Sequence, residues 1–500
     1  MTLYRSANAA GEPGGPGAPG EPGGPGGGAR RALVRLVRAV RRHVDLLTNS
    51  GSMMAAILVN SLLGFAYWWL AAKAFPPEAV GSASAAVSAM TVIGTLGMFG
   101  MGTLLIAELP RIPAARRWNL IATCLLIAGG AATLGGLGYV ALAHLAVPAL
   151  RGALGSPLWA ALLVAGIALT AIALVLDEGL IGLLAGRTQL LRNIYFAAGK
   201  LILLGGLALL AIEVTGGEVL ATWVAGLLLS IVLLVVSLRR QGRLGSVRPD
   251  PSMLRGLGRR AFGHNLLNIA MFLPRTALPL VVTVVLSTRD TAGFYTAWMI
   301  FAFLAMVPST LATTLFAVAA GESAALRSKV RMALFVSLAA GVPASLLLAL
   351  LARPVMVLFG REYAATAAGA LAVLALTYLP TVFRQLFIAI ARVRRFVRVA
   401  TAVAVLAGAA ELAAAWYGGA HGDLTTLTVG FAVVVAVEGL VMAPVVLRVA
   451  LARPAPRTVP SPRTPPPVPR AEPVPDLDRT QELDLDLTQE IPLTRPGGAW

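Results

Sequence analysis

The sequence predicts an all-α integral membrane protein, with about twelve transmembrane helices in two six-helix lobes around a central cleft and with disordered N- and C-terminal tails. Its 500 residues are 57% hydrophobic and only 13% charged, with a mean hydropathy of +0.79. Soluble globular chains carry about 25% charged residues. Apolar segments of about 20 residues, the length that crosses a bilayer, recur along the chain. A basic segment at 239–260, too polar to span, divides them into two sets.

The N-terminal region divides into two parts. Residues 1–28 are rich in glycine and proline and have no means of burying a core, so they are predicted to be a disordered tail. They lack a basic segment leading into an apolar one, and so do not resemble a signal peptide. Residues 29–50 carry arginines at helical spacing. This lead-in is predicted to be either an amphipathic helix on an anionic leaflet or an extension of the first span with snorkelling arginines.

The membrane region has an N-lobe at 51–238 and a C-lobe at 261–449. Each is predicted to hold six spans. The predicted spans are 52–74, 82–107, 119–143, 158–184, 194–214, 219–238, 261–287, 294–319, 332–352, 369–390, 399–418 and 427–449.

Basic residues alternate between successive connections. They are frequent after even-numbered spans and sparse after odd-numbered ones. Because basic residues accumulate on the cytoplasmic side, the pattern predicts a multi-pass protein of the cell membrane with both termini and the 239–260 linker in the cytoplasm. The net charge of +18 follows from this pattern, since the positive residues line the ends of spans. A basic patch for nucleic acid is therefore not predicted.

The C-terminal tail at 450–500 is proline-rich and then acidic, and is predicted to be disordered and cytoplasmic. The tripeptide Thr-Gln-Glu begins at both Thr480 and Thr488, each time among acidic residues. Phosphate on a threonine adds charge and strong acceptor oxygens. These threonines are therefore candidate phosphosites for a phosphothreonine-binding regulator, and a plain solvated tail is the alternative.

Three stretches occur in a set order along the membrane region. Residues 46–85 give a polar lead-in, a span and a Pro-Pro-Glu-Ala-Val-Gly turn; 176–201 give a charged hairpin; and 355–380 give an aromatic-Gly-x-x-Tyr entry to a span. This ordered set resembles the multidrug/oligosaccharidyl-lipid/polysaccharide exporter superfamily, and within it the Wzx-type polysaccharide flippases. The resemblance implies a flippase that moves polyprenyl-diphosphate-linked oligosaccharide across the cytoplasmic membrane by alternating access, for exopolysaccharide or cell-envelope glycan synthesis.

Ionisable residues inside spans are costly, and they are functional candidates for that reason. Arg275 lies about 14 residues into the seventh span, roughly 20 Å deep at 1.5 Å per residue, with Pro274 and Pro279 beside it. A buried guanidinium is suited to a lipid diphosphate. Arg275 is therefore predicted to bind substrate, with a structural ion pair as the alternative. The further candidates for substrate binding are Arg384, Lys200, Asn60 and Asn268.

Four carboxylates in the spans are candidates for gating or ion coupling. Asp177 and Glu178 lie in the fourth span. Asp177 is expected at the depth of Lys200, so an ion pair between those two is one interpretation; the other is a gate in which Asp177 or Glu178 pairs with Arg384 when the cytoplasmic side is shut. Glu411 and Glu438 are candidates to face each other and hold a coupling proton or cation, and packing polarity is the alternative.

No catalytic constellation emerges, and no cofactor or metal is expected. The single Cys124 and four scattered histidines form no ligand motif, and no Walker lysine motif is present. The chain is thus predicted not to be an enzyme. Two alternatives to the flippase are a cation-coupled multidrug exporter of the same superfamily, whose lumen should favour acids, and a membrane scaffold that recruits envelope-synthesis enzymes.

Overall fold

The computed structural model describes residues 61–451 apart from 147–155, 184, 211–212, 246, 255–257, 320–325 and 395, and without the side chains of 146, 258–265, 268 and 313–319. Asn60, Thr480 and Thr488, the N-terminal tail, the lead-in at 29–50 and the C-terminal tail from 452 onward lie outside the described residues, and the first two residues of the predicted C-terminal tail belong to the last helix. The side chain of Asn268 lies outside them too.

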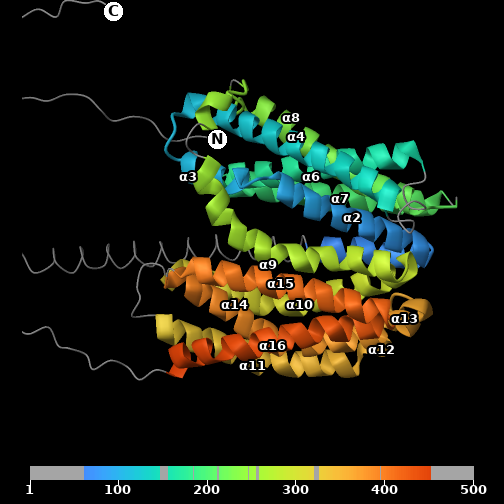
Figure 1. The fold of residues 1–500 in the computed structure, drawn as a ribbon. Coiled ribbons are helices and arrows are strands. Elements are labelled where there is room, and N and C mark those ends of the chain that lie inside the picture. Colours follow the sequence, from blue (N-terminus) through green and yellow to red (C-terminus); the bar gives the residue numbers. More distant parts are fainter. Residues whose placement is uncertain are drawn as a thin grey trace, which may run out of the picture. The chain divides into compact units, whose positions relative to one another are not determined.

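The described chain is helical throughout its apolar segments (Figure 1). The helices of the first half are 61–74, α2 (Pro77–Gly97), α3 (Met101–Glu108), α4 (Ala114–Ala146), α6 (Pro157–Gly182), α7 (Gly186–Leu209) and α8 (Gly216–Arg240). Those of the second half are η1 (Pro251–Leu254), α9 (Gly258–Val285), α10 (Thr288–Ala319), α11 (Leu326–Leu350), α12 (Ala352–Val357), α13 (Arg361–Leu376), α14 (Tyr378–Val393), α15 (Val397–Ala420) and α16 (Leu424–Leu451).

Within the described residues, nine helices are long and apolar enough to cross a membrane, and ten if the bent pair α13 and α14 is one span. The first predicted span is described only over 61–74, and the part of α9 whose side chains are described without a gap is the apolar stretch Ile269–Val285. Each predicted span is mainly helical where it is described, although the spans predicted at 82–107 and 369–390 are interrupted and those at 194–214 and 261–287 end in non-helical residues. The prediction of an all-helical, multi-span membrane protein is confirmed.

The helices form two bundles that meet along α2, α9 and α10 (Figure 1). Helices α2 to α8 pack mainly with one another, and α9 to α16 likewise. The linker between the bundles is attached to α4. There the Trp118 indole donates a hydrogen bond to the Arg243 carbonyl at 2.9 Å, and the Asn119 carboxamide oxygen accepts one from the Arg248 amide at 3.1 Å. This part of the linker therefore follows the first bundle.

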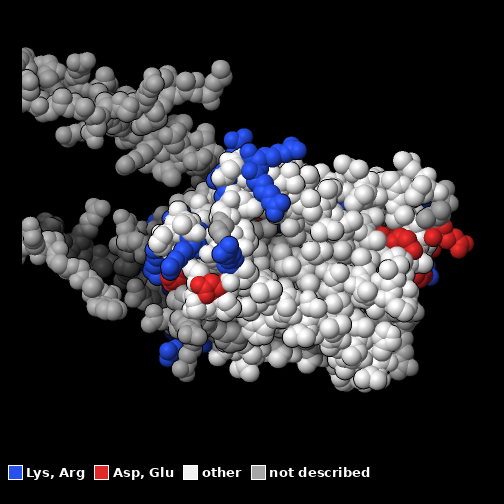
Figure 2. Space-filling view, turned by 90° about the horizontal axis from the view of Figure 1, so that it is seen from above, with Lys and Arg blue, Asp and Glu red and all other residues white. Residues whose placement is uncertain are grey.

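The two ends of the bundles differ in charge. Figure 2 shows Lys and Arg gathered at one end and a group of Asp and Glu at the other. We call the first the basic end, where α6, α8, α10, α14 and α16 finish, and the second the acidic end. At the acidic end Asp423 precedes α16 and accepts a hydrogen bond from the Thr426 amide at 2.8 Å. Hydrogen bonds from the Thr426 backbone and side chain lower the pKa of Asp423, as expected for a carboxylate at a helix N-terminus.

Two spans are interrupted. Between α2 and α3, Phe99 and Gly100 have φ angles of 44° and 77° in the left-handed region, which costs a non-glycine residue roughly 1–2 kcal/mol. Helices α13 and α14 meet at 46° next to Thr377. Irregular backbone at membrane depth is tolerated where it lies against protein or a wet cavity. The bend at Thr377 lies against protein, since Thr377 and Tyr378 are buried, whereas Met98 at the other break lines a cavity.

The bundles are in close contact toward the acidic end. A Cβ at Gly81 of α2 would overlap the Thr288 carbonyl at the start of α10, so only glycine permits this approach. The ring of Trp68 lies 4.7 Å from that of Tyr295, and the ring of Phe65 lies 5.7 Å from that of Phe303. These contacts close the acidic half of the space between the bundles.

Candidate functional site

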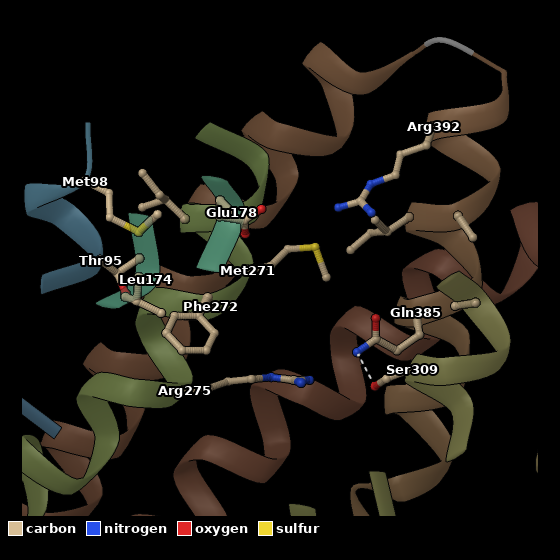
Figure 3. A pocket seen from close by; sticks show the side chains of 14 residues that line it. Thr95, Met98, Leu174, Glu178, Met271, Phe272, Arg275, Ser309, Gln385 and Arg392 are labelled. Atoms are coloured by element: carbon tan, nitrogen blue, oxygen red, sulfur yellow. Dashed lines mark hydrogen bonds between the residues drawn. The ribbon is translucent and has the colours of Figure 1, made fainter. Parts of the chain in front are cut away.

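A cavity of about 460 Å³ lies between the two bundles, in the half nearer the basic end (Figure 3). Its walls come from α2, α6, α9, α10 and α14, with one further residue at the break after α2. The lining residues are Thr95, Met98, Leu174, Glu178, Ile269, Met271, Phe272, Arg275, Ser309, Ala312, Gln385, Ile388, Ala389 and Arg392. Both bundles contribute, so any relative movement of the bundles changes this cavity.

Arg275 extends into the cavity from α9 (Figure 3). It has no hydrogen bond or ion pair with any described residue. Pro274 and Pro279 lie inside the same helix, and Pro274 packs against Gly408 of α15. This contact fixes the backbone from which the guanidinium projects. The structure therefore places the main predicted substrate residue in a cavity.

The other polar groups of the cavity come from both bundles. Glu178 of α6 and Arg392 of α14 extend toward the space from different bundles (Figure 3). Gln385 donates a hydrogen bond to the Ser309 hydroxyl at 3.1 Å. The predicted span 369–390 ends before Arg392, whereas α14 continues to Val393, and no prediction named Gln385 or Ser309. A sequence pattern could have identified this wall of the cavity, because positions 385, 388, 389 and 392 have the spacing of residues on one face of a helix.

Arg384 lies outside this cavity, in a buried ionic cluster of the second bundle. Its Nη1 donates hydrogen bonds to Glu411 of α15 and to Glu438 of α16, the latter at 2.9 Å. All three residues are buried, with 9%, 1% and 7% of their surfaces exposed. Glu411 and Glu438 were predicted to face each other, and in the structure they are brought together by their shared contact with Arg384. The expectation that Arg384 faces the substrate lumen is not met, because its side chain is directed into its own bundle.

The cluster has polar atoms without partners. Nε and Nη2 of Arg384 and Oε1 of Glu438 are buried and have no hydrogen bond. A small cavity of about 20 Å³ lies beside them, lined by Arg275, Arg384, Glu411 and Glu438 among apolar residues. Two carboxylates with one guanidinium leave one negative charge uncompensated when all are ionised. This arrangement is chemically suited to accept a proton or a monovalent cation.

Asp177 forms an ion pair in the first bundle, but not with the residue we predicted. Arg192 of α7 donates hydrogen bonds to both carboxylate oxygens of Asp177, at 2.7 and 2.6 Å, and a third to Ser230 of α8. The predicted pairing with Lys200 is therefore wrong. Helix α7 begins at Gly186, eight residues before the predicted span. That start brings Arg192 into the helix and within reach of Asp177, with Lys200 two turns farther along.

Lys200 lies in an aromatic cage inside the first bundle. Its Nζ is 3.4 Å from the ring centroid of Trp223, 4.6 Å from Phe196 and 5.0 Å from Tyr67. Cation–π contacts of this kind stabilise a cation away from water. Lys200 is buried and does not line the central cavity, so the predicted contact with substrate is not favoured in this conformation. Among the described residues, no group of three or more His, Cys, Asp or Glu is arranged to hold a metal ion.

Comparison with solved structures shows the fold. The chain is similar to the inward-facing conformation of a multidrug resistance MATE family transporter of the MOP superfamily (TM-score 0.62, 14% identity, 79% of this chain and 96% of that chain). It is also similar to the outward-facing conformation of a transporter with the same description (TM-score 0.55, 15% identity, 80% of this chain and 94% of that chain). A third match is the lipid II flippase MurJ in an inward closed conformation (TM-score 0.57, 13% identity, 80% of this chain and 89% of that chain).

No protein-family model matches the sequence, and no curated protein matches it by sequence. The structural matches nonetheless agree on one architecture. The chain therefore has the fold of MOP superfamily transporters, which confirms the superfamily fold implied by the sequence resemblance. Assignment to the Wzx-type flippases stays a prediction.

Removing Arg384 alone is predicted to destabilise the protein strongly, because two buried carboxylates lose their shared cation. Breaking a buried pair in this way costs about 3–5 kcal/mol. We expect Arg384→Met to lower the melting temperature of the purified protein at neutral pH, and Glu411→Gln with Glu438→Gln to restore most of the loss. The control is Arg289→Met, which removes an exposed pair with Glu362 at 3.3 Å. Equal melting of the two arginine variants contradicts the prediction.

Proposed function

We propose that this protein is a flippase for polyprenyl-diphosphate-linked glycan, which it moves across the cytoplasmic membrane by alternating access. The single observation that carries the proposal is Arg275, a guanidinium without an ionic partner among the described residues, extending into a cavity of about 460 Å³ between the bundles. A charge at such depth is costly unless it faces a wet space or a partner. An anionic headgroup supplies that partner.

A diphosphate fits the chemistry of this cavity. Guanidinium groups hold phosphate oxygens through paired, charge-assisted hydrogen bonds. The side chains of Thr95 and Gln385 in the cavity lining offer hydrogen-bonding groups for sugar hydroxyls. The prenyl chain remains in the bilayer. Basic residues accumulate on the cytoplasmic side, so we take the basic end, and both chain termini, to be cytoplasmic.

The contacts between the bundles support an alternating-access cycle. The acidic half is closed through Gly81, Trp68 and Tyr295, while the cavity occupies the basic half. The TM-score to the inward-facing MATE conformation is 0.62, against 0.55 to the outward-facing one. This difference supports an inward-facing state that loads substrate from the cytoplasm. Domain rocking about the midplane then exposes the cavity to the other side.

Glu178 and Arg392 are our candidates for the cytoplasmic gate. The gate expected from sequence paired Asp177 or Glu178 with Arg384, but Asp177 is held by Arg192 and Arg384 by Glu411 and Glu438. Glu178 and Arg392 instead line the cavity from opposite bundles. Closure of the basic half brings the bundles together, and with them these opposite charges.

The multidrug exporter remains the alternative, favoured by the similarity to MATE transporters. Organic cations call for acidic groups, and the cavity lining has one described carboxylate, Glu178, against Arg275 and Arg392. This balance supports an anionic substrate. Glu411 and Glu438 are proposed to hold the coupling proton or cation. A membrane scaffold would tolerate neutralisation of Arg275, which the following measurement tests.

Neutralising Arg275 is predicted to slow lipid flipping. Proteoliposomes containing a fluorescent polyprenyl-diphosphate-linked disaccharide are treated with a membrane-impermeant quencher, and the rate of label exposure is measured. Loss of a hydrogen bond to a charged group costs about 1.5–3 kcal/mol, so Arg275→Ala should slow flipping roughly ten- to a hundredfold. Arg289→Ala, at the exposed acidic end, is the matched control. Wild-type flipping by the Arg275 variant contradicts the proposal. Export of an organic cation that depends on Glu178 and not on Arg275 favours the alternative.

Charge reversal tests the gate. Glu178→Arg and Arg392→Glu place like charges across the closing cavity, so each single variant should lose most flipping. The double reversal restores an attractive pair and should recover a substantial part of the rate in the same vesicle measurement. A double variant no better than the single variants counts against this gate.

We also propose that phosphorylated Thr480 and Thr488 recruit a phosphothreonine-binding regulator. The support is sequence alone: two Thr-Gln-Glu tripeptides in an acidic tail. Phosphothreonine-reading domains recognise such groups through arginine clusters. A synthetic 471–500 peptide phosphorylated at both threonines should bind a phosphothreonine-reading domain, and the unphosphorylated peptide should not. Equal binding of the two peptides would remove the basis for this proposal.

A further inference from the structure

Arg275 lines two cavities at once. On one side it borders the central cavity, and on the other the small cavity of about 20 Å³ in the second bundle. The small cavity is lined from α9, α14, α15 and α16, and its ionisable residues are Arg275, Arg384, Glu411 and Glu438. Among the described residues facing the central cavity, the charged groups are Glu178 and Arg392 besides Arg275 itself. Arg275 therefore stands between an acidic cluster and the proposed substrate space.

The acidic cluster lacks one positive charge. Nη1 of Arg384 serves both Glu411 and Glu438, while Oε1 of Glu438 is buried without a partner. With all groups ionised, the cluster carries a net charge of −1 in a region of low dielectric, where charges interact strongly. Arg384 is already engaged with both acids. Of the cations that line the small cavity, Arg275 is the one that remains to compensate them.

We propose that Arg275 is shared between this acidic cluster and the substrate. With Glu411 and Glu438 both ionised, the cluster attracts Arg275 and withdraws it from the central cavity. A proton from water that adds to a carboxylate oxygen of Glu438 removes the excess charge and releases Arg275 toward a diphosphate. Proton binding and substrate binding are thereby coupled through one guanidinium. This inference rests on the proposed function, because it takes a diphosphate as the anion that Arg275 binds.

The local backbone favours such sharing. Pro274 packs against Gly408, one turn before Glu411 on α15, so the start of the Arg275 side chain is fixed at the wall of the cluster. The guanidinium at its tip extends into the central cavity (Figure 3). Movement of the side chain alone then selects between two anionic partners. Coupling between two ligands is reciprocal, so diphosphate binding must be accompanied by proton uptake.

Binding of inorganic pyrophosphate to the full-length protein in nanodiscs tests the coupling. Dissociation constants are measured by isothermal titration calorimetry at about pH 8 and about pH 6 for wild type and Glu438→Gln. At each pH the ratio of the two constants is compared, because the protonation of pyrophosphate itself affects both proteins equally. We expect Glu438→Gln to bind roughly tenfold more tightly at the higher pH, equivalent to 1.4 kcal/mol, and equally at the lower pH. Arg275→Ala should bind weakly at both. Glu362→Gln, an exposed acid, is the control and should match wild type.

A second measurement needs no ligand. Melting temperatures are compared for Arg275→Gln, Glu438→Gln and the double variant at about pH 8. Groups that interact give non-additive changes, so we expect the double variant to differ from the sum of the single changes. Additive changes overturn the sharing of Arg275. Weaker pyrophosphate binding in Arg275→Ala without tighter binding in Glu438→Gln also overturns it, while leaving the proposed function intact. Wild-type protein that does not bind pyrophosphate removes the proposed substrate class, and the coupling with it.

Discussion

The structure depends on the cost of placing ionised side chains within a membrane, which each bundle meets by pairing them internally. In the first bundle an acid of the fourth span, Asp177, is held by Arg192 of the fifth. In the second bundle the corresponding span, the tenth, carries the base Arg384, and the acids Glu411 and Glu438 follow on later spans. Both bundles therefore contain a buried ion pair, with the acid on the fourth span in the first bundle and the base on the tenth span in the second. Lys200 is enclosed by aromatic rings instead of an acid, whereas Arg275 extends into the cavity and has no ionic partner among the described residues.

Backbone irregularity and charge converge on the same region. The break between α2 and α3 places Thr95 and Met98 at the cavity wall, and the bend before α14 orients the helix that carries Gln385 and Arg392. A continuous helix satisfies its own hydrogen bonds, so a break at this depth is stable only beside protein or water. The cavity and the break after α2 are therefore parts of one region between the bundles.

Residue patterns predicted the spans well and the pairs poorly. The spans follow from hydropathy and length, which are local properties, and the described helices coincide with them. Position along a helix was harder to predict: Asp177 was expected level with Lys200 but pairs with Arg192, two turns earlier on α7. Which side of a helix faces which neighbour was not readable, because rotation is set by packing among several helices. For this reason Arg384 was expected to face the lumen. Lys200 and Arg392 were missed for a different reason, because α7 begins before its predicted span and α14 extends beyond the predicted end at 390.

The sequence by itself determined that the chain is a helical membrane protein with a few ionisable residues inside its spans, because hydrophobicity and charge act residue by residue. Only the tertiary structure decided which of those residues compensate one another and which face the cavity. Neighbouring side chains on one helix, such as Asp177 and Glu178, or Arg384 and Gln385, point about 100° apart. A single position along the helix therefore separates a buried ion pair from a cavity wall, and only helix packing fixes that rotation.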